Sequence, residues 1–192
     1  MKGKLEDYKG YDQELSKKFG MTIEEMYRDH PIYKDRNKGI VEFALKDKPE
    51  SIFEFACTYD FLALEIIREL PDVRYVCTNF DPEVVEYIQN KMGVKSFVFD
   101  ANEIPYTDLT EFDAFVCTSL EHFENDIEIL DSLPEPCIIY FCVTNMPDRT
   151  HAWGFDVEWE IYDRYKDVMR IVDYKIFKQH NRMKMIGRGK RD

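Results

Sequence analysis

The chain has 192 residues, of which 44% are hydrophobic and 15% aromatic, a composition typical of folded rather than disordered proteins. Its 38 acidic and 26 basic residues give a formal net charge of -12, and because an acidic surface repels phosphate backbones we expect no nucleic-acid partner. No apolar run approaches the roughly 20 residues of a membrane-spanning helix, so we expect no membrane partner either.

The first part of the chain, 1–48, is polar and is predicted to be helical. Thr22 followed by Glu25 forms a capping-box pattern, which predicts that a helix begins directly after Thr22. Apolar residues at helical spacing over 37–46 predict another helix, and this one ends before Pro49. We therefore expect a helical segment in front of the part of the chain that forms strands.

Beyond this segment, short apolar runs alternate with stretches of helical periodicity. The predicted strands cover 51–56, 74–78, 94–99, 112–118 and 137–143. The predicted helices cover 61–70, 81–91, 120–130 and 156–164. Asp81 and Pro82 supply an N-cap and a first helical residue for the second of these helices, and Gly93 follows its end.

Two further predicted strands, 168–177 and 183–187, are joined by the short turn 178–181, so they must be antiparallel. The alternation before them is typical of a parallel sheet with helices on both faces. The sequence therefore predicts an α/β, doubly wound, seven-stranded sheet that is mostly parallel and has a C-terminal antiparallel hairpin. Because there is no linker or internal repeat, we expect a single domain over 1–192 with its core over 49–192.

The five cysteines have no Cys-x-x-Cys spacing, and four of them lie in apolar, strand-like runs. These four are Cys77, Cys117, Cys137 and Cys142. We expect buried, reduced thiols rather than disulfides or zinc ligands, which makes the cytoplasm the expected location. The N-terminal residues contain no apolar stretch typical of a secretion signal. The four histidines are scattered along the sequence, so we expect no metal site.

Polar side chains follow each of the five predicted parallel strands. They lie within 54–60, 78–81, 100–106, 118–123 and 144–151. In doubly wound sheets a ligand binds outside the carboxyl ends of the strands, so these ends together predict a binding site. An amide or acid after the second strand suits ribose hydroxyls, an acid after the third suits an exocyclic amine, and the turn after the first presents backbone N–H groups to an anionic group. We therefore expect a nucleoside-type ligand.

The segments 99–106 and 112–123 together resemble the class I S-adenosylmethionine-dependent methyltransferases, in the small-molecule, type 11-like branch. In that family an acid after the third strand holds the adenine, and a Leu-Glu-His run follows the fourth. The segments 81–86 and 145–151 resemble the corresponding helix start and loop. The resemblance implies a Rossmann-like fold, S-adenosyl-L-methionine as cofactor, and methyl transfer to oxygen or nitrogen of a small-molecule acceptor such as a sugar or related metabolite.

The resemblance also implies which residues bind the cofactor. Glu54 would organise the loop after the first strand, Asn79 takes the place of the ribose-binding acid, Asp100 would face the adenine amine, and Ser119 would lie near the methionine part. The full implied set is Glu54, Ala56, Cys57, Thr58, Asn79, Phe80, Asp100, Ala101, Thr118 and Ser119.

The loop after the first strand departs from the family pattern of alternating glycines, because Ala56, Thr58 and Asp60 occupy those positions. Asn79 supplies no negative charge, unlike the family's acid. A bound cofactor would therefore require an altered loop path around Thr58. Two alternatives stay open: a catalytically inactive, methyltransferase-like binding protein, and an enzyme that cleaves S-adenosylmethionine on the same fold.

His122 and His151 are the candidate catalytic residues. The resemblance puts His122 at the mouth of the pocket, where it is either a general base or a structural residue. His151 precedes Trp153 and Phe155, and this cluster is either a lid over the acceptor or the packing face of the next helix. Methyl transfer mainly requires alignment of donor and acceptor, since the sulfonium is already reactive. A homodimer is the base-rate expectation for the oligomeric state.

Overall fold

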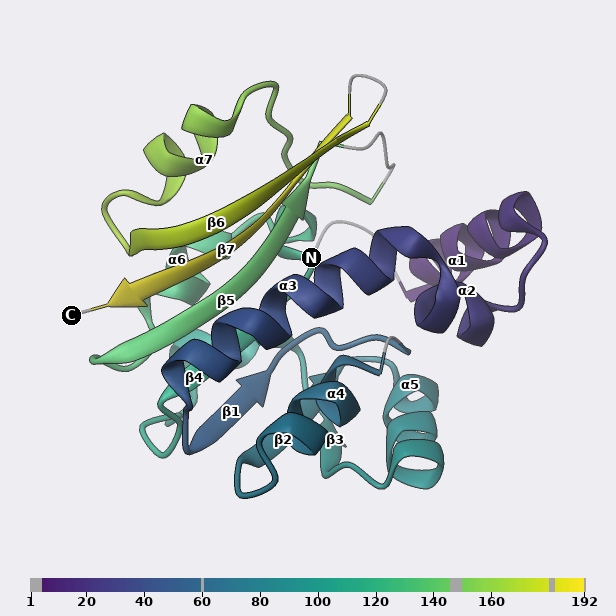
Figure 1. Ribbon diagram of the computed structural model, residues 1–192, viewed down its shortest axis with the longest axis horizontal. Coiled ribbons are helices and arrows are strands. Elements are labelled where there is room, and N and C mark those ends of the chain that lie inside the picture. Colours follow the sequence, from purple (N-terminus) through teal and green to yellow (C-terminus); the bar gives the residue numbers. More distant parts are fainter. Residues whose placement is uncertain (1–4, 60, 146–149, 180–181, 192) are drawn as a thin grey trace.

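A seven-stranded sheet in the order β3-β2-β1-β4-β5-β7-β6 forms the centre of the computed structural model, which describes residues 5–59, 61–145, 150–179 and 182–191 (Figure 1). Strands β1 to β5 pair in parallel, and β7 runs antiparallel to both β5 and β6. The strands are β1 Ser51–Glu54, β2 Arg74–Asn79, β3 Ser96–Val98, β4 Ala114–Cys117, β5 Cys137–Thr144, β6 Arg170–Gln179 and β7 Arg182–Arg191. The predicted doubly wound sheet with a C-terminal hairpin is confirmed.

The helices cover both faces of the sheet. They are α1 Leu5–Phe19, α2 Ile23–Asp29, α3 Pro31–Asp47, α4 Leu62–Glu69, α5 Pro82–Tyr87, α6 Asp126–Asp131 and α7 Glu158–Tyr165. Short turns of other helix types cover Ile88–Met92, Ala101–Tyr106 and Leu120–His122. Apolar side chains of α3, α4 and α5 pack in one core, and those of α6 and α7 pack in a second core on the opposite face. Strands that are buried on both faces explain the near-continuous apolar runs in the sequence.

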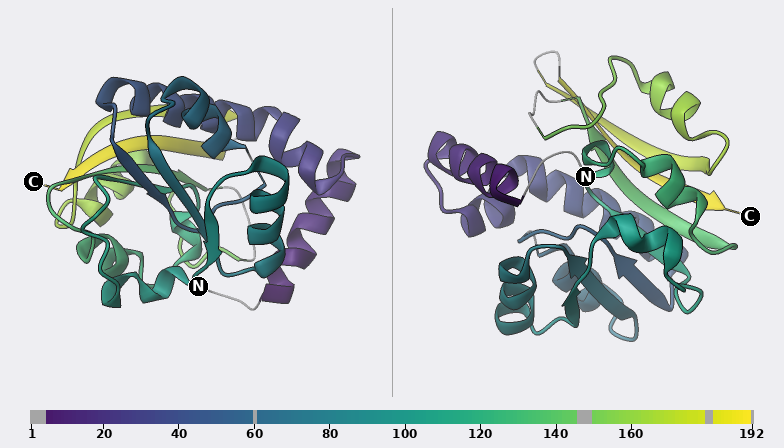
Figure 2. Two further views of the ribbon diagram at one scale, coloured as in Figure 1. Left: turned by 90° about the horizontal axis from the view of Figure 1, so that it is seen from below. Right: turned by 180° about the vertical axis from the view of Figure 1, so that it is seen from behind.

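Helices α1 and α2 lie beyond the carboxyl end of β1, to which its arrowhead points (Figure 1), and Figure 2 shows them projecting from the body of the sheet. The predicted capping box is present: the Thr22 hydroxyl accepts from the Glu25 N–H at 3.1 Å, and the Glu25 carboxylate accepts from the Thr22 N–H at 2.9 Å. Helix α3 is longer than predicted, since His30 caps it and Pro31 is its first residue. The helical segment therefore reaches the edge of the sheet where a ligand is expected.

The prediction of one helix over 120–130 is wrong. The chain instead forms a single turn at Leu120–His122 and starts α6 at Asp126. Phe123 is fully buried between the two, and the buried Asp126 carboxylate accepts from the Arg164 guanidinium at 2.8 and 2.6 Å and from the Tyr165 hydroxyl at 2.8 Å. These tertiary contacts with α7 fix where the helix begins.

The four cysteines predicted to be buried are buried, and Cys57 is buried as well; all five are free thiols. Over the residues that the structure describes, no helix is both long and apolar enough to cross a membrane. Of the predicted turn 178–181, His180 and Asn181 lie outside the described residues.

Candidate functional site

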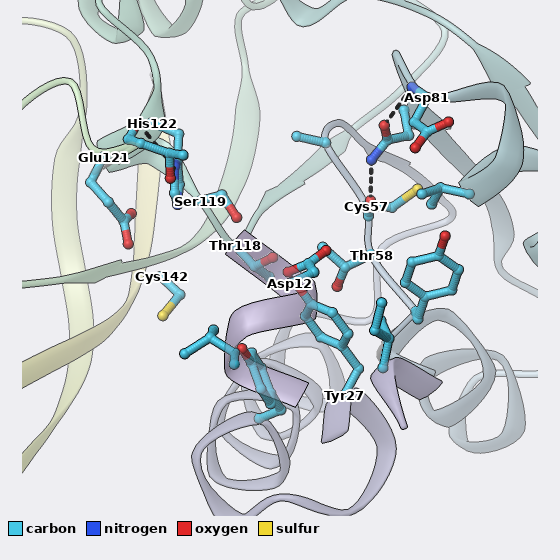
Figure 3. A pocket seen from close by; sticks show the side chains of 18 of the residues that line it. Asp12, Tyr27, Cys57, Thr58, Asp81, Thr118, Ser119, Glu121, His122 and Cys142 are labelled. Atoms are coloured by element: carbon cyan, nitrogen blue, oxygen red, sulfur yellow. Dashed lines mark hydrogen bonds between the residues drawn. The ribbon is translucent and has the colours of Figure 1, made fainter. Parts of the chain in front are cut away.

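A cavity of about 280 Å³ lies at the carboxyl ends of the parallel strands. Its wall includes the loop 56–59 after β1, the end of β2 over 79–81, and the segment 118–123 after β4. Side chains of α1, α2 and α3 close it from the opposite side, as the close view of the cavity shows (Figure 3). Ligands of doubly wound sheets bind at this edge, so the cavity lies where the sequence predicts a binding site.

The loop after β1 keeps a backbone conformation that favours glycine. Ala56 has a φ of 57°, in the left-handed region, where a Cβ atom approaches the following carbonyl oxygen. The next residue is fixed by a bond from the Cys57 N–H to the Thr78 carbonyl at 2.9 Å. Ala56, Cys57 and Thr58 all line the cavity, while Asp60 lies outside the described residues. The turn at Ala56 thus has the left-handed conformation that glycine adopts readily.

Two threonine hydroxyls lie at the cavity wall without a hydrogen-bond partner among the described residues. Thr58 Oγ1 comes from the loop after β1, and Thr118 Oγ1 comes from the end of β4. A buried hydroxyl without a partner costs free energy, and a bound ligand with polar groups would remove that cost. Ser119 lines the same wall, so the predicted pair Thr118 and Ser119 is brought together with Thr58.

Glu54 forms hydrogen bonds with β2 at the base of the loop and does not line the cavity as the described residues form it. It is 1% exposed, and its carboxylate accepts from the Tyr75 hydroxyl at 3.1 Å and from the Cys77 thiol at 3.4 Å. The Thr78 hydroxyl donates to its carbonyl at 3.0 Å. These bonds hold the end of β1 against β2, and Glu54 is absent from the cavity wall formed by the described residues.

Asn79 connects the two loops that flank the cavity. Its Nδ2 donates to the Cys57 carbonyl, and its Oδ1 accepts from the Asp81 N–H at 2.7 Å. A carboxylate at this position could accept the second bond but could not donate the first. Asn79, Phe80 and Asp81 all line the cavity. The bond that its Nδ2 donates is therefore a structural reason for an amide at this position.

Asp100 and Ala101 lie away from the cavity wall. Asp100 starts the turn Ala101–Tyr106, and its Oδ1 accepts from the Asn102 N–H at 3.0 Å and from Asn102 Nδ2 at 2.7 Å. Ala101 is 3% exposed and packs in the core. Neither belongs to the wall of the cavity as the described residues form it, so their contact with an adenine stays a prediction.

His122 and His151, distant in sequence, meet at one end of the cavity. Their rings are 4.7 Å apart and nearly perpendicular. His122 Nδ1 lies 3.0 Å from the Thr150 hydroxyl, and His151 Nε2 lies 3.7 Å from a carboxylate oxygen of Glu121. Glu121 is 2% exposed, and its only signal in the sequence is its place in the Leu-Glu-His run. Of the 145–151 loop, Met146 to Arg149 lie outside the described residues.

Two buried cations from opposite ends of the chain also line the cavity. Arg36 comes from α3 and Lys184 from β7, and they are 4% and 9% exposed. Burial lowers the pKa of the Lys184 ammonium, which donates to the Ile32 carbonyl at 2.6 Å. Both cations lie over the ring of Tyr33. Sequence reasoning missed them, since isolated cations in a helix and a strand carry no motif.

Helices α1 and α2 are joined to each other and to α5 at the cavity rim. The Tyr27 hydroxyl donates to Asp12 at 2.8 Å, and burial raises the pKa of the Tyr27 phenol well above its usual value. Lys9 forms ion pairs with Glu83 at 2.8 Å and with Asp81 at 3.4 Å. The N-terminal segment is thus part of the site, which the sequence did not predict.

No family model and no curated protein matches the chain. Several solved structures are similar to the chain. The N-methyltransferase NodS from Bradyrhizobium japonicum WM9 has a TM-score of 0.65 at 12% identity, covering 84% of this chain and 97% of NodS. Magnesium protoporphyrin IX methyltransferase (ChlM) from Synechocystis PCC 6803, solved with bound SAM (S-adenosylmethionine), has a TM-score of 0.63 at 13% identity, covering 83% and 79%.

A third similar structure covers almost the whole chain. The 1,6-didemethyltoxoflavin-N1-methyltransferase from Burkholderia thailandensis, solved with S-adenosylhomocysteine, has a TM-score of 0.65 at 12% identity, covering 99% of this chain and 92% of that enzyme. At such low identity the likeness establishes the fold alone, and that fold is the one the sequence resemblance implies.

Proposed function

We propose that this chain, which has the fold of the class I methyltransferases, binds S-adenosylmethionine in the cavity and transfers its methyl group to a small-molecule acceptor. One observation carries the proposal: the loop after β1 retains a left-handed turn at Ala56, and it shares a single cavity with the ends of β2 and β4. The similar structures solved with SAM or S-adenosylhomocysteine support the same cofactor here.

The polar groups of the cavity suit the parts of this cofactor. The hydroxyls of Thr58 and Thr118 offer hydrogen bonds to its methionine part. The Asp81 carboxylate and the remaining Asn79 N–H lie at the end of β2, where ribose hydroxyls bind in such folds. Phe80 supplies an apolar surface beside them. Asp100 and Ala101 remain the proposed adenine contacts, on the resemblance alone.

The chemistry requires alignment and, for a hydroxyl acceptor, a base. The acceptor oxygen or nitrogen forms a bond to the methyl carbon while the carbon–sulfur bond breaks, and that electron pair stays on sulfur to give S-adenosylhomocysteine. We propose that His151 or His122, whose imidazoles lie at one end of the cavity, accepts the proton that the acceptor loses. Glu121, 3.7 Å from His151 Nε2, stabilises the imidazolium that forms.

Arg36 and Lys184 favour an acceptor that carries a negative charge. Both are buried cations in a protein of net charge -12, and both line the cavity. A carboxylate or phosphate on the acceptor would pair with them in a region that excludes water. The same acidic net charge argues against nucleic-acid substrates, and the five buried, reduced thiols fit a reducing compartment such as the cytoplasm.

The test is product analysis after incubation with methyl-labelled S-adenosylmethionine and a panel of small acids, each paired with its neutral amide. The proposal predicts S-adenosylhomocysteine and a labelled product, with the acid preferred over its amide. Methylthioadenosine formed without any acceptor would instead identify a cleaving enzyme. Binding without turnover on any compound would favour the inactive alternative, which the replaced glycines and Asn79 motivate.

A further inference from the structure

The wall of the cavity contains one cluster of metal-ligating side chains that the proposed methyl transfer uses only in part. Glu121 and His122 follow β4, and His151 follows β5. One ligand atom from each of the three lies within 4.8 Å of the other two. Figure 3 shows Glu121 and His122 on the same side of the cavity. The expectation of no metal site followed from the sequence separation of the histidines, and the fold removes that separation.

We propose that Glu121, His122 and His151 bind a divalent cation of the zinc type at the acceptor end of the cavity. Two imidazoles and one carboxylate are a ligand set of catalytic zinc sites, which keep a further coordination position open. Two ligands about 2.1 Å from a tetrahedral ion lie about 3.4 Å apart, so ligand atoms up to 4.8 Å apart need to approach by up to about 1.4 Å. The cation also offsets the cost of burying the Glu121 carboxylate.

Hydrogen bonds outside the cluster orient its members. When His122 Nδ1 carries the proton, it donates to the Thr150 carbonyl at 3.3 Å or to the Thr150 hydroxyl at 3.0 Å, and Nε2 keeps its lone pair for a metal. The Thr144 N–H donates to Glu121 Oε1 at 3.2 Å. Metal-binding histidines and carboxylates are held in this way by neighbouring groups.

The backbone ties the two ligand-bearing segments together. The Ala152 N–H, directly after His151, donates to the Glu121 carbonyl at 2.7 Å. His151 therefore stays beside Glu121 whatever its side chain binds. The cluster borders the cavity that Lys184 and Arg36 also line, so a metal bound there would lie beside the space assigned to the acceptor.

This inference deepens the proposed function, on which its role in catalysis rests. A metal at this place would bind an acceptor oxygen and lower the pKa of its hydroxyl. His122 and His151 would then be metal ligands and not the base, and the acceptor proton would pass to solvent. The acceptor class would then be an oxygen nucleophile with a second oxygen or nitrogen donor near it, able to chelate.

The experiment is a titration of the EDTA-treated full chain with Co²⁺ and Zn²⁺ in the absence of S-adenosylmethionine. The proposal predicts one equivalent bound, with visible Co²⁺ absorption that lacks thiolate charge-transfer bands. His151→Gln and Glu121→Gln each weaken binding by at least about tenfold. His30→Asn is the matched control, since it removes a histidine outside the cavity and keeps a capping oxygen for α3; it leaves the titration unchanged.

Several outcomes would overturn the proposal: no binding, equal binding by His151→Gln and the unchanged chain, or thiolate bands that report the cysteines. His122→Gln replaces either variant that fails to fold by circular dichroism. A parallel titration with S-adenosylhomocysteine in EDTA separates the two proposals. Nucleoside binding without Co²⁺ binding refutes the metal site alone, and Co²⁺ binding without nucleoside binding refutes the proposed cofactor.

Discussion

At the scale of single residues, Ala56 adopts a backbone conformation that favours glycine. Its φ of 57° is a conformation that costs an alanine roughly 1–2 kcal/mol. The altered loop path around Thr58 that a bound cofactor would require stays a prediction, and the turn at Ala56 has the handedness that glycine adopts readily. The side chain at this position is a methyl group, which still leaves a cavity beside it.

Ala56→Gly is expected to raise the free energy of unfolding by up to about 1 kcal/mol, since glycine adopts positive φ without steric cost. The matched control is Ala63→Gly in α4, where the alanine is buried in an ordinary helix, and this change lowers the free energy by about 1 kcal/mol. Urea denaturation measures both. Equal destabilisation by the two changes would show that the turn at Ala56 is not strained.

Asn79 leads to a second prediction, in which an acid replaces the amide. In Asn79→Asp a carboxylate faces the Cys57 carbonyl and loses the donated bond, so the free energy of unfolding falls by about 1–3 kcal/mol at pH 7. Burial and the carbonyl raise the folded pKa of the new acid, so the loss shrinks as pH falls toward about 4, where the protonated acid can donate.

Chemical denaturation at the two pH values checks this expectation. Asn90→Asp adds the same charge at an exposed position, and its effect stays within about 0.5 kcal/mol. A stability of Asn79→Asp equal to that of the unchanged chain at both pH values would mean that the amide bonds contribute nothing.

At the scale of elements, β7 packs its glycines against aromatic and thioether side chains. Gly187 pairs with Phe141 of β5, and a Cβ built on Gly187 would lie 2.1 Å from the Phe141 ring. A separation that short forces the ring or a strand to move. The close contact therefore fixes the hairpin on the sheet.

Gly187→Ala is expected to lower the free energy of unfolding by about 1–3 kcal/mol, because it overpacks this contact. Gly154→Ala is the control, since nothing lies within 4 Å of a Cβ built there, and it changes stability by less than about 0.5 kcal/mol. Thermal unfolding compares the two. Indistinguishable melting temperatures would contradict the described packing.

Elements whose ends depend on residues close in sequence could be predicted, whereas elements whose ends depend on distant residues could not. The helix start after Thr22 and the N-cap at Asp81 depend on residues within three positions of each other, and both are present in the structure. The break between Leu120 and Asp126 depends on Arg164 and Tyr165, nearly 40 positions away. No local pattern reports such a contact.

At the scale of the whole molecule, the site joins segments from the entire chain. Alternation of strands and helices predicted the edge of the sheet where the cavity lies, together with Ala56, Thr58 and Asn79 in its wall. Closure by α1 to α3 and the approach of Lys184 from β7 depend on how the chain folds back on itself. Those features could not be inferred from periodicity, which describes elements and not their packing.

Because several buried thiols have raised pKa values, we expect the free energy of unfolding to decrease at alkaline pH. Burial raises the pKa of Cys117 well above its usual value, that of Cys137 to about 12 and that of Cys142 to about 11. An unfolded chain loses these protons near pH 8.5, so the folded state holds more protons above that pH. Stability is then constant below about pH 8.5 and falls above it by up to about 1.4 kcal/mol per pH unit for each thiol.

Cys137→Ala removes one of these groups away from the cavity. The slope of unfolding free energy against pH between about 9 and 10 is expected to become shallower by about 1 kcal/mol per pH unit, whatever the substitution costs in packing. If the unfolding free energies of the variant and the unchanged chain had the same slope against pH, Cys137 would not contribute to the loss of stability at alkaline pH.

The central claim is that the cavity at the carboxyl ends of β1, β2 and β4 binds the cofactor of the class I methyltransferases. Calorimetric titration of the full chain with S-adenosylhomocysteine tests it most directly, with Thr58→Phe as a variant that fills the cavity. We predict binding of one equivalent with a Kd below about 1 mM, corresponding to about -4.1 kcal/mol or better, and its loss in Thr58→Phe. No heat of binding at millimolar ligand, or equal binding by the variant, would contradict the claim.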